Sequence, residues 1–334
     1  MKTLNKFSPE IESRHYESLK RRVARGIKKI CETANQKNPR EKAYCTALKI
    51  IGVKNLLIGD VCLLRRIVMF FDRILPEGDF LNPKSPEYSK RFSDVTEVAK
   101  KAFGYEYFCR TPDAGGKWGG WALAQELYKS LKYCPYCNAE TLYAFKWRRD
   151  GKLYMAKSAF DHFFPRARYP FLGLSLYNLI PCCARCNSTF KGGYSYDLPM
   201  TAHPYASDMD SKMRFYALLS NPSDVLHGDD AGLAGIAFAE RHYGSFMPGV
   251  LWDRLFKVST SYSLLYLRDA ALTIARMLRY PKSYVDAMMK RLDEVGLPIA
   301  DFESQLYGAP LDRKEINKHR LGKMIADIAE TYRC

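Results

Sequence analysis

Two short stretches, "CPYC" at residues 134–137 and "CCARCN" at residues 182–187, decide how the centre of the chain folds. Each contains a pair of cysteines with two residues between them. Cysteines grouped in this way can be reactive thiols, disulfide partners or metal ligands. Four thiolates from two such pairs can close a tetrahedral zinc site, so the spacing predicts a structural zinc that fastens the two ends of the intervening segment. The predicted ligands are Cys134, Cys137, Cys183 and Cys186.

The sequence gives the two alternatives to a metal less support. Disulfides are rare in a reducing cytoplasm, and no histidine lies within the cluster to activate a thiol as a nucleophile. Cys182 falls outside the two-residue spacing, so we expect it to pack in the interior. The other cysteines stand alone and are interpreted as ordinary thiols: Cys31, Cys45, Cys62, Cys109 and Cys334.

Composition indicates a folded protein with a basic surface. The chain has 334 residues, 47% of them hydrophobic, and a net charge of +16. This charge attracts phosphate backbones, which makes nucleic acid the leading candidate partner. The run "LLIGDVCLLRRIVMFF" is interrupted by Asp60, Arg65 and Arg66, so it is too short for a membrane span, and the first residues lack a secretory signal pattern. We therefore expect a cytoplasmic protein without a membrane partner.

Residues 1–130 are predicted to be mainly helical. Apolar residues recur at helical spacing in residues 16–30: Tyr16, Leu19, Val23, Ile27 and Ile30. The opposite side carries six basic residues: Lys20, Arg21, Arg22, Arg25, Lys28 and Lys29. This side is either a solvated basic face or a face that follows phosphates. A second helix is expected from Asp60 as N-cap to just before Pro76, followed by a loop over residues 76–94.

The glycine-rich stretch "TPDAGGKWGGW" at residues 111–121 has the spacing of neither a P-loop nor a dinucleotide fingerprint, so a flexible boundary loop is favoured. Residues 196–334 are again predicted to be mainly helical. Helical patterns cover residues 261–280 and 283–295, and a capping box predicts that the last helix opens at Asp312 and Glu315.

The central segment, residues 131–195, has a different pattern. Aromatic and apolar runs flank "RRDG" at residues 148–151, which predicts a short β-hairpin with its tip there. Between and beside the cysteine pairs stand four residues that can perform acid–base chemistry, bind a hard metal ion or fix a loop: Asp161, His162, Asn178 and Asn187.

This arrangement resembles the HNH endonucleases, also called ββα-metal or His-Me finger nucleases. The family pattern is an Asp-His pair, a nearby proline, Asn-Leu, C-x-x-C-N and Lys-Gly. The matching residues are Asp161, His162, Pro165, Asn178, Leu179, Cys183, Cys186, Asn187, Lys191 and Gly192. The resemblance covers residues 134 to about 193, and "NSTFKG" has one residue more than the commonest form. It implies a zinc-stapled ββα core and says nothing about the flanking residues. Together with the helical patterns on either side, this predicts an α+β fold in which the core is inserted between two mainly helical regions.

The resemblance also implies hydrolysis of phosphodiester bonds. A neutral imidazole can take a proton from water, so His162 is the predicted general base. Asp161 and Asn187 offer oxygens to Mg²⁺ or another divalent ion, and Asn178 is implied to orient the loop that carries His162. Seven basic residues are candidates for phosphate contacts, although each is equally open to being an ordinary surface charge: Arg148, Arg149, Lys152, Lys157, Arg166, Arg168 and Lys191.

The sequence therefore predicts a metal-dependent HNH endonuclease, with DNA favoured over RNA as substrate. The organisation loosely resembles HNH components of bacterial anti-phage systems, which would imply a regulatory subunit such as an ATPase. The alternative is a catalytically silent zinc module that binds nucleic acid or protein. The other histidines are interpreted as structural: His15, His203, His227, His242 and His319.

Overall fold

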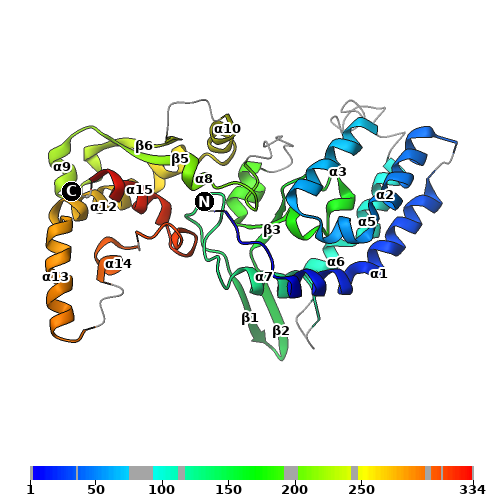
Figure 1. The fold of residues 1–334 in the computed structure, drawn as a ribbon, viewed down its shortest axis with the longest axis horizontal. Helices are drawn as coiled ribbons and strands as arrows, with labels where there is room; N and C mark the ends of the chain where they lie inside the picture. The colour runs from blue at the N-terminus through cyan, green and yellow to red at the C-terminus, as the bar shows by residue number, and fades with distance from the viewer. Residues whose placement is uncertain are drawn as a thin grey trace. The chain divides into compact units, whose positions relative to one another are not determined.

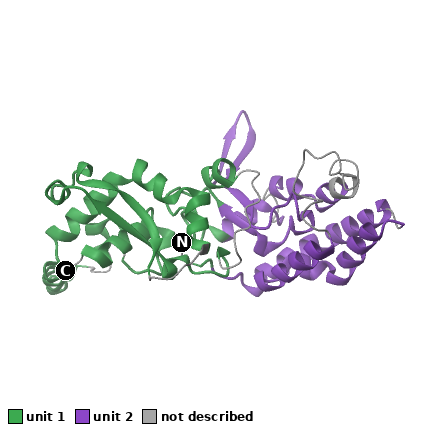
Figure 2. Ribbon diagram, turned by 90° about the horizontal axis from the view of Figure 1, so that it is seen from above, with its two compact units in different colours: residues 1–4, 127–143, 182–334 green, residues 5–126, 144–181 purple. Residues whose placement is uncertain are grey.

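The computed structural model describes residues 3–34, 37–74, 93–111, 117–191, 202–241, 247–297, 302–309 and 311–332. The chain forms two compact units, coloured separately in Figure 2. Unit 1 consists of Met1–Leu4, Leu127–Tyr143 and Cys182–Cys334, and unit 2 of Asn5–Glu126 and Ala144–Pro181. Both combine helices with two-stranded sheets, which confirms the α+β class. The segment expected as a central core contributes residues to both units.

Unit 2 consists mainly of helices. They are α1 (Pro9–Thr33), α2 (Pro39–Ile58), α3 (Val61–Ile74), α5 (Ser93–Phe103), α6 (Tyr105–Arg110) and α7 (Gly120–Leu127), the last ending at the unit boundary (Figure 1). Helix α1 opens after Ser8, whose hydroxyl accepts a hydrogen bond from the Ile11 amide at 3.4 Å. Its predicted apolar side is confirmed, since four of the five residues are buried and Tyr16 is half-buried. This side packs against α2 and α5.

The predicted second helix is confirmed as α3. Asp60 caps it, because its carboxylate accepts a hydrogen bond from the Leu63 amide at 2.8 Å, and the helix ends at Ile74. The expected loop over residues 76–94 lies largely outside the described residues, and its last two residues already belong to α5. Of the glycine-rich stretch, residues 112–116 also lie outside the described part. Trp118, Gly119 and Gly120 are buried, so this described portion is packed.

The predicted hairpin is confirmed as β1 (Ala144–Arg149) paired with β2 (Lys152–Lys157). Its turn residues Asp150 and Gly151 have φ values of 50° and 72°. Positive φ at both positions is the geometry of the two-residue turn that matches strand twist. The next strand, β3 (Ala159–His162), pairs with β4 (Leu179–Cys182). Two 3₁₀ turns lie between them: η3 (Pro170–Leu172) and η4 (Leu176–Asn178).

Unit 1 contains a further sheet and most of the remaining helices. The antiparallel strands are β5 (Met213–Leu219) and β6 (Leu233–Glu240). The helices are η5 (Arg185–Lys191), α8 (Met209–Lys212), α9 (Pro222–Leu226), η7 (Asp230–Gly232), α10 (Met247–Phe256), α11 (Val258–Leu265), α12 (Leu267–Arg279), α13 (Lys282–Glu294), α14 (Phe302–Tyr307), η8 (Ile316–Lys318) and α15 (Gly322–Tyr332). Helix α15 packs against α12 and β5, while α11 packs against β6.

The helical patterns expected over residues 261–280 and 283–295 are confirmed, the first as α11 and α12 and the second as α13. Residues 261–280 form parts of two helices, because the backbone of Tyr266 leaves helical geometry between α11 and α12. The prediction that the last helix opens at Asp312 was wrong. The Asp312 carboxylate does accept a hydrogen bond from the Lys314 amide at 2.9 Å, but only a 3₁₀ turn follows, and the helix begins at Gly322. The chain between them is held by hydrogen bonds to Asn138, which follows the first cysteine pair.

Among the described residues, no helix is both long and apolar enough to span a membrane.

Candidate functional site

The first cysteine pair sits in a tight turn of unit 1. The Cys134 amide donates to the Glu140 carbonyl at 2.9 Å, and the Asn138 amide donates to the Cys134 carbonyl at 2.7 Å. Asn138 has a φ of 55°, which is the left-handed conformation that asparagine tolerates better than most residues. The turn therefore reverses the chain immediately after Cys137 and directs both thiols to the same side.

The second pair lies where strand β4 gives way to the helical turn η5. The Cys186 amide points at the Cys183 sulfur at 3.4 Å, and the Asn187 amide donates to the Cys183 carbonyl at 3.0 Å. Cys182 is buried on β4 and does not belong to the cluster of cysteines. Its neighbour Cys183 does, because the chain turns into η5 at that point.

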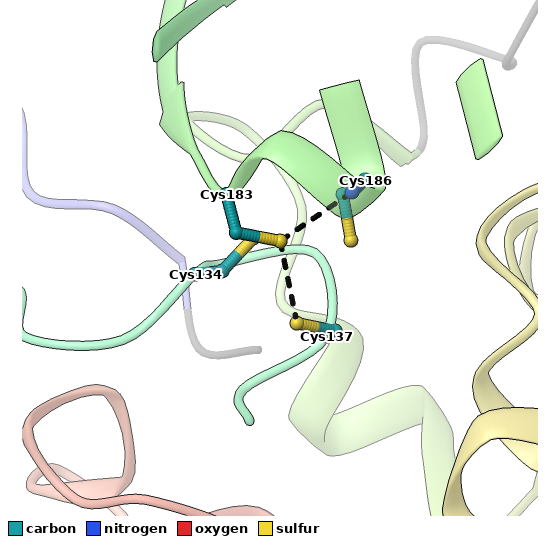
Figure 3. Close-up of side chains that lie close together, drawn as sticks. All are labelled: Cys134, Cys137, Cys183 and Cys186. Carbon is teal, nitrogen blue, oxygen red and sulfur yellow. Dashed lines mark hydrogen bonds between the residues drawn. The ribbon is translucent and has the colours of Figure 1, made fainter. Parts of the chain in front are cut away.

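The four predicted ligands converge (Figure 3). All four are buried, and their sulfurs lie within 4.8 Å of one another, with Cys137 and Cys183 4.0 Å apart. Zinc–sulfur bonds of about 2.3 Å in a tetrahedron place sulfurs about 3.8 Å apart. The cluster can therefore hold a metal such as zinc with little adjustment, which agrees with the prediction from the spacing.

Burial and mutual hydrogen bonds shift the pKa values of the clustered thiols in opposite directions. Burial, together with the neighbouring thiols, raises the pKa of Cys134 well above its ordinary value. The pKa of Cys137 lies well below its ordinary value, because its sulfur accepts hydrogen bonds from the other three cysteines. Metal ligands are thiolates, and four thiolates in such a small buried space would need a compensating charge, which a divalent ion would supply.

Aromatic residues of α10 and α11 contact the segment that contains the first cysteine pair. The Trp252 indole donates to the Tyr136 carbonyl at 3.0 Å, and the Tyr262 hydroxyl donates to the Cys137 carbonyl at 2.7 Å. The Tyr136 ring stacks on Phe256 with centroids 4.2 Å apart. These contacts fix the backbone on which the thiols stand, in the way that groups around a metal site orient its ligands.

Asn138 links the cysteine cluster to the C-terminal part of the chain. Its side chain donates to the Ile316 carbonyl at 2.8 Å and accepts from the Lys323 amide at 2.8 Å. Its carbonyl accepts from the Leu321 amide at 2.9 Å. These bonds engage backbone groups that a continuous helix from Asp312 would use internally, which explains why the last helix starts late. The sequence signal was an asparagine directly after C-x-x-C.

The start of α15 also contains a buried ionic cluster that sequence reasoning missed. The Lys323 ammonium lies 2.9 Å from both Asp210 and Asp327, and all three side chains are buried. Burial alone would raise the pKa of Asp210, but Lys323 and Arg313 outweigh it and lower the pKa to about 2. Each buried charge in the cluster therefore has a partner of opposite sign, which offsets the cost of its burial.

The Asp-His pair lies at the end of β3 in unit 2. Asp161 is buried and His162 half-buried. The His162 Nε2 atom lies 3.0 Å from the Gly173 carbonyl, and its ring meets Tyr105 edge-on with centroids 4.4 Å apart. A carbonyl only accepts hydrogen bonds, so in neutral His162 the hydrogen belongs on Nε2 and the lone pair on Nδ1.

Asn178 is fully buried and bonds to the backbone of the segment that follows His162. Its Oδ1 accepts from the Phe164 amide at 2.7 Å, and its Nδ2 donates to the carbonyls of Phe164 and Leu172, each at 3.1 Å. One side chain therefore holds both ends of the segment from 164 to 172. Gly173, whose carbonyl meets His162, follows directly.

Asn187 and Lys191 belong to η5 in unit 1, whereas Asp161, His162 and Asn178 belong to unit 2. Asn187 is half-buried on the turn that begins at the second cysteine pair. Lys191 is 4% exposed, which differs from the surface position expected of a residue that contacts phosphates.

The other candidate phosphate contacts differ in exposure. Arg148, Arg149 and Lys152 are exposed at the tip of the hairpin. Lys157 is half-buried, with its ammonium 4.3 Å from the Phe160 ring centroid. Arg166 pairs with a carboxylate, that of Glu106, and Arg168 pairs with Asp72 at 2.9 Å. At the tip Arg149 also lies 3.6 Å from a carboxylate, that of Asp150, but both side chains are exposed. The hairpin tip is therefore the most open part of this set.

Sequence reasoning missed the aromatic face of the hairpin. Trp147 and Tyr154 are cross-strand neighbours, stacked with centroids 5.5 Å apart and 42% and 41% exposed. Phe145 lies on the same face, 5.6 Å from Trp147. The sequence contained the information needed to predict this face. Once the turn at 150–151 fixes the strand register, residues 145, 147 and 154 must lie on the same side of the hairpin.

Two histidines interpreted as structural are buried. The Nε2 of His15 lies 2.8 Å from the Leu174 carbonyl, its Nδ1 accepts from the Trp118 indole at 3.0 Å, and burial lowers its pKa to about 4. Burial and the charge of Lys191 lower the pKa of His203 to about 3. Of the others, His227 is exposed, His319 is half-buried, and His242 lies outside the described residues.

Comparisons with known proteins give no match to this chain among protein-family models, curated proteins or solved structures.

Proposed function

We propose that the protein is a metal-dependent endonuclease of the HNH kind that hydrolyses phosphodiester bonds in nucleic acid, with DNA favoured. The observation that carries the proposal is the Asn178 side chain, which holds the segment behind the Asp-His pair by three hydrogen bonds. Along the chain the elements follow the order strand, loop, strand and helical turn. A ββα nuclease core is built in this order.

His162 is the proposed general base. Its contact with the Gly173 carbonyl favours the tautomer with the lone pair on Nδ1, which can take a proton from the attacking water. Because Asn178 fixes the backbone up to Leu172, the carbonyl that orients the imidazole is itself held in place. Asn178 is thus a positioning residue.

Asp161 and Asn187 are the proposed protein ligands of a catalytic divalent ion such as Mg²⁺. A hard ion of this kind prefers oxygen ligands and often uses only one or two from the protein. Bound there, it would neutralise charge on the phosphate and the leaving oxygen. The cysteine cluster would hold structural zinc and thereby fix the start of η5, on which Asn187 lies.

The exposed hairpin supports nucleic acid as the partner. Its tip carries three exposed cations for phosphates, and its aromatic face offers rings on which bases can stack. We place the protein in the cytoplasm, where a reducing environment keeps the cysteines available to zinc. A place in a bacterial anti-phage system with a regulatory subunit such as an ATPase is part of the same proposal, and rests on the loose resemblance alone.

A catalytically silent zinc module is the competing function, because the hairpin and the cysteine cluster would serve binding without chemistry. A nicking assay on supercoiled DNA, with and without Mg²⁺, separates the two. We expect Mg²⁺-dependent nicking by the wild type and none by His162→Ala. Binding that persists in both proteins without any cleavage of DNA or RNA would favour the silent module.

A further inference from the structure

Unit 2 contains a basic pocket that the proposed nuclease chemistry does not use. It has a volume of about 530 Å³, within the range of small-molecule sites. Helix α1 supplies three of its cations, Arg21, Arg22 and Arg25, and the segment before α7 supplies the fourth, Lys117. The basic side of the first helix and the lysine of the glycine-rich stretch, which are distant in sequence, thus line the same cavity.

The cations in this pocket lack the carboxylates that neutralise their neighbours on the same helix. Lys20 pairs with Glu17 at 2.5 Å, and Lys28 lies 3.7 Å from Glu32. Within the described part of the chain, none of the four pocket cations forms an ion pair, and no acidic residue lines the cavity. Like charges gathered in one concave surface repel each other unless an anion joins them.

The pocket is supported by rigid groups. The Arg22 guanidinium donates to the Gly104 carbonyl at 3.4 Å and lies 3.9 Å from the centroid of the Tyr107 ring. Trp118, which forms part of the wall, is buried and donates to His15. Tyr107 is 64% exposed as a residue even with Arg22 over its ring, so part of it remains open to a planar group. At least one cation and one ring are thus in place before any ligand arrives.

We propose that this pocket binds a small ligand with two or more adjacent phosphate groups, of the class of a nucleoside triphosphate. Four cations match the charge of a polyphosphate, and arginine donates to phosphate oxygens in pairs. The ring of Tyr107 is suited to stacking against a base. The site is independent of the proposed cleavage chemistry, since it contains none of the Asp161, His162 or Asn178 side chains.

The test is isothermal titration calorimetry of the full chain with inorganic tripolyphosphate, ATP and a single-stranded oligothymidine, in buffer without divalent ions. The Arg21→Gln/Arg25→Gln double variant alters two exposed side chains of the pocket. Lys28→Gln/Lys29→Gln is the matched control, because it removes the same charge from the same helix outside the pocket. Circular dichroism checks that both variants are folded.

We expect tripolyphosphate and ATP to bind, and the pocket variant to weaken both by about tenfold or more, since charge-assisted hydrogen bonds to phosphate are strong. The control should change affinity by less than about twofold, because exposed charges outside the site are screened. No binding of either compound by the wild type, or an equal loss in both variants, overturns the proposal. Binding of the oligonucleotide through Arg21 and Arg25 without binding of tripolyphosphate also overturns it, in favour of a surface that follows a nucleic-acid backbone. None of these outcomes depends on cleavage.

Discussion

The cysteine cluster of unit 1 and the His162 segment of unit 2 hold their key residues in different ways. In the cluster, four thiols from two distant segments converge on a point where a metal ion can join them. In the His162 segment, one buried amide side chain bonds three backbone groups. If the first arrangement holds the metal that its geometry allows, it depends on an ion from outside the chain, whereas the second consists of the chain alone. Replacing one of the four cysteines should therefore destabilise the protein more than replacing Asn178 in the His162 segment.

The largest effect is expected from Cys134→Ser or from the same change at any of the other three ligands. Structural zinc contributes about 10–16 kcal/mol of apparent binding free energy in small domains, so its loss should unfold the surroundings and abolish activity. Metal analysis and circular dichroism measure both effects, with about one zinc per chain expected in the wild type. Cys182→Ser is the control and should retain the metal. Fully active protein without zinc would contradict the assignment.

His162→Ala should lower the cleavage rate by about 10²–10⁴ while the protein stays folded and binds nucleic acid, because a general base acts on the rate. Single-turnover cleavage of a labelled duplex with Mg²⁺ measures the rate, and His227→Ala, at an exposed histidine, serves as control. Cleavage at the wild-type rate would remove His162 from the mechanism and leave the segment a purely structural feature.

Acid should destabilise unit 2 through His15. Its pKa in the folded protein is about 4, below the ordinary 6.5, so the unfolded chain takes up the proton first as pH falls. The stabilisation is complete above about pH 6.5 and is lost progressively down to pH 4, by about 3 kcal/mol in total. Urea unfolding across this range should show a shallower pH dependence for His15→Gln than for the wild type. Identical slopes would mean that His15 does not set this dependence.

Asn178→Ala should reduce the free energy of unfolding by about 2–4 kcal/mol, because it leaves the buried Phe164 amide without its acceptor. Cleavage should fall as well, since the Gly173 carbonyl that orients His162 is no longer held. Asn55→Ala removes an exposed side-chain hydrogen bond to Ile51 and should cost less than about 1 kcal/mol. Equal losses in the two variants, measured by urea unfolding, would show that the segment is held by other contacts.

The smallest effect is expected at the hairpin. Trp147→Ala should weaken binding of a single-stranded oligonucleotide by about 1–3 kcal/mol, the usual contribution of one stacked base. Leu153→Ala is the matched control, because Leu153 is 50% exposed on the opposite face of the same hairpin. Fluorescence anisotropy without divalent ions measures both. A loss of the same size in the control would argue against stacking.

Several features could be read from the sequence because they depend on local spacing. The two-residue gaps of the cysteines, the cap at Asp60 and the turn at Asp150–Gly151 each involve groups a few residues apart, so local chemistry determines them. The start of the last helix was misjudged for the opposite reason. The capping residue Asp312 is present, but Asn138 bonds to the same stretch from a distant position and prevents the helix from forming there.

The sequence by itself determined the α+β class, the hairpin and the set of cysteines that can hold a metal, since periodicity and ligand spacing are carried by neighbouring residues. Only the tertiary structure decided which charges are available to a partner. Lys191 and Arg148 are both basic in the sequence, yet one is buried and the other exposed. Lys117 and Arg21 line the same cavity only because the chain folds. Burial and charge pairing arise from contacts between residues far apart in the chain, which spacing along the sequence does not encode.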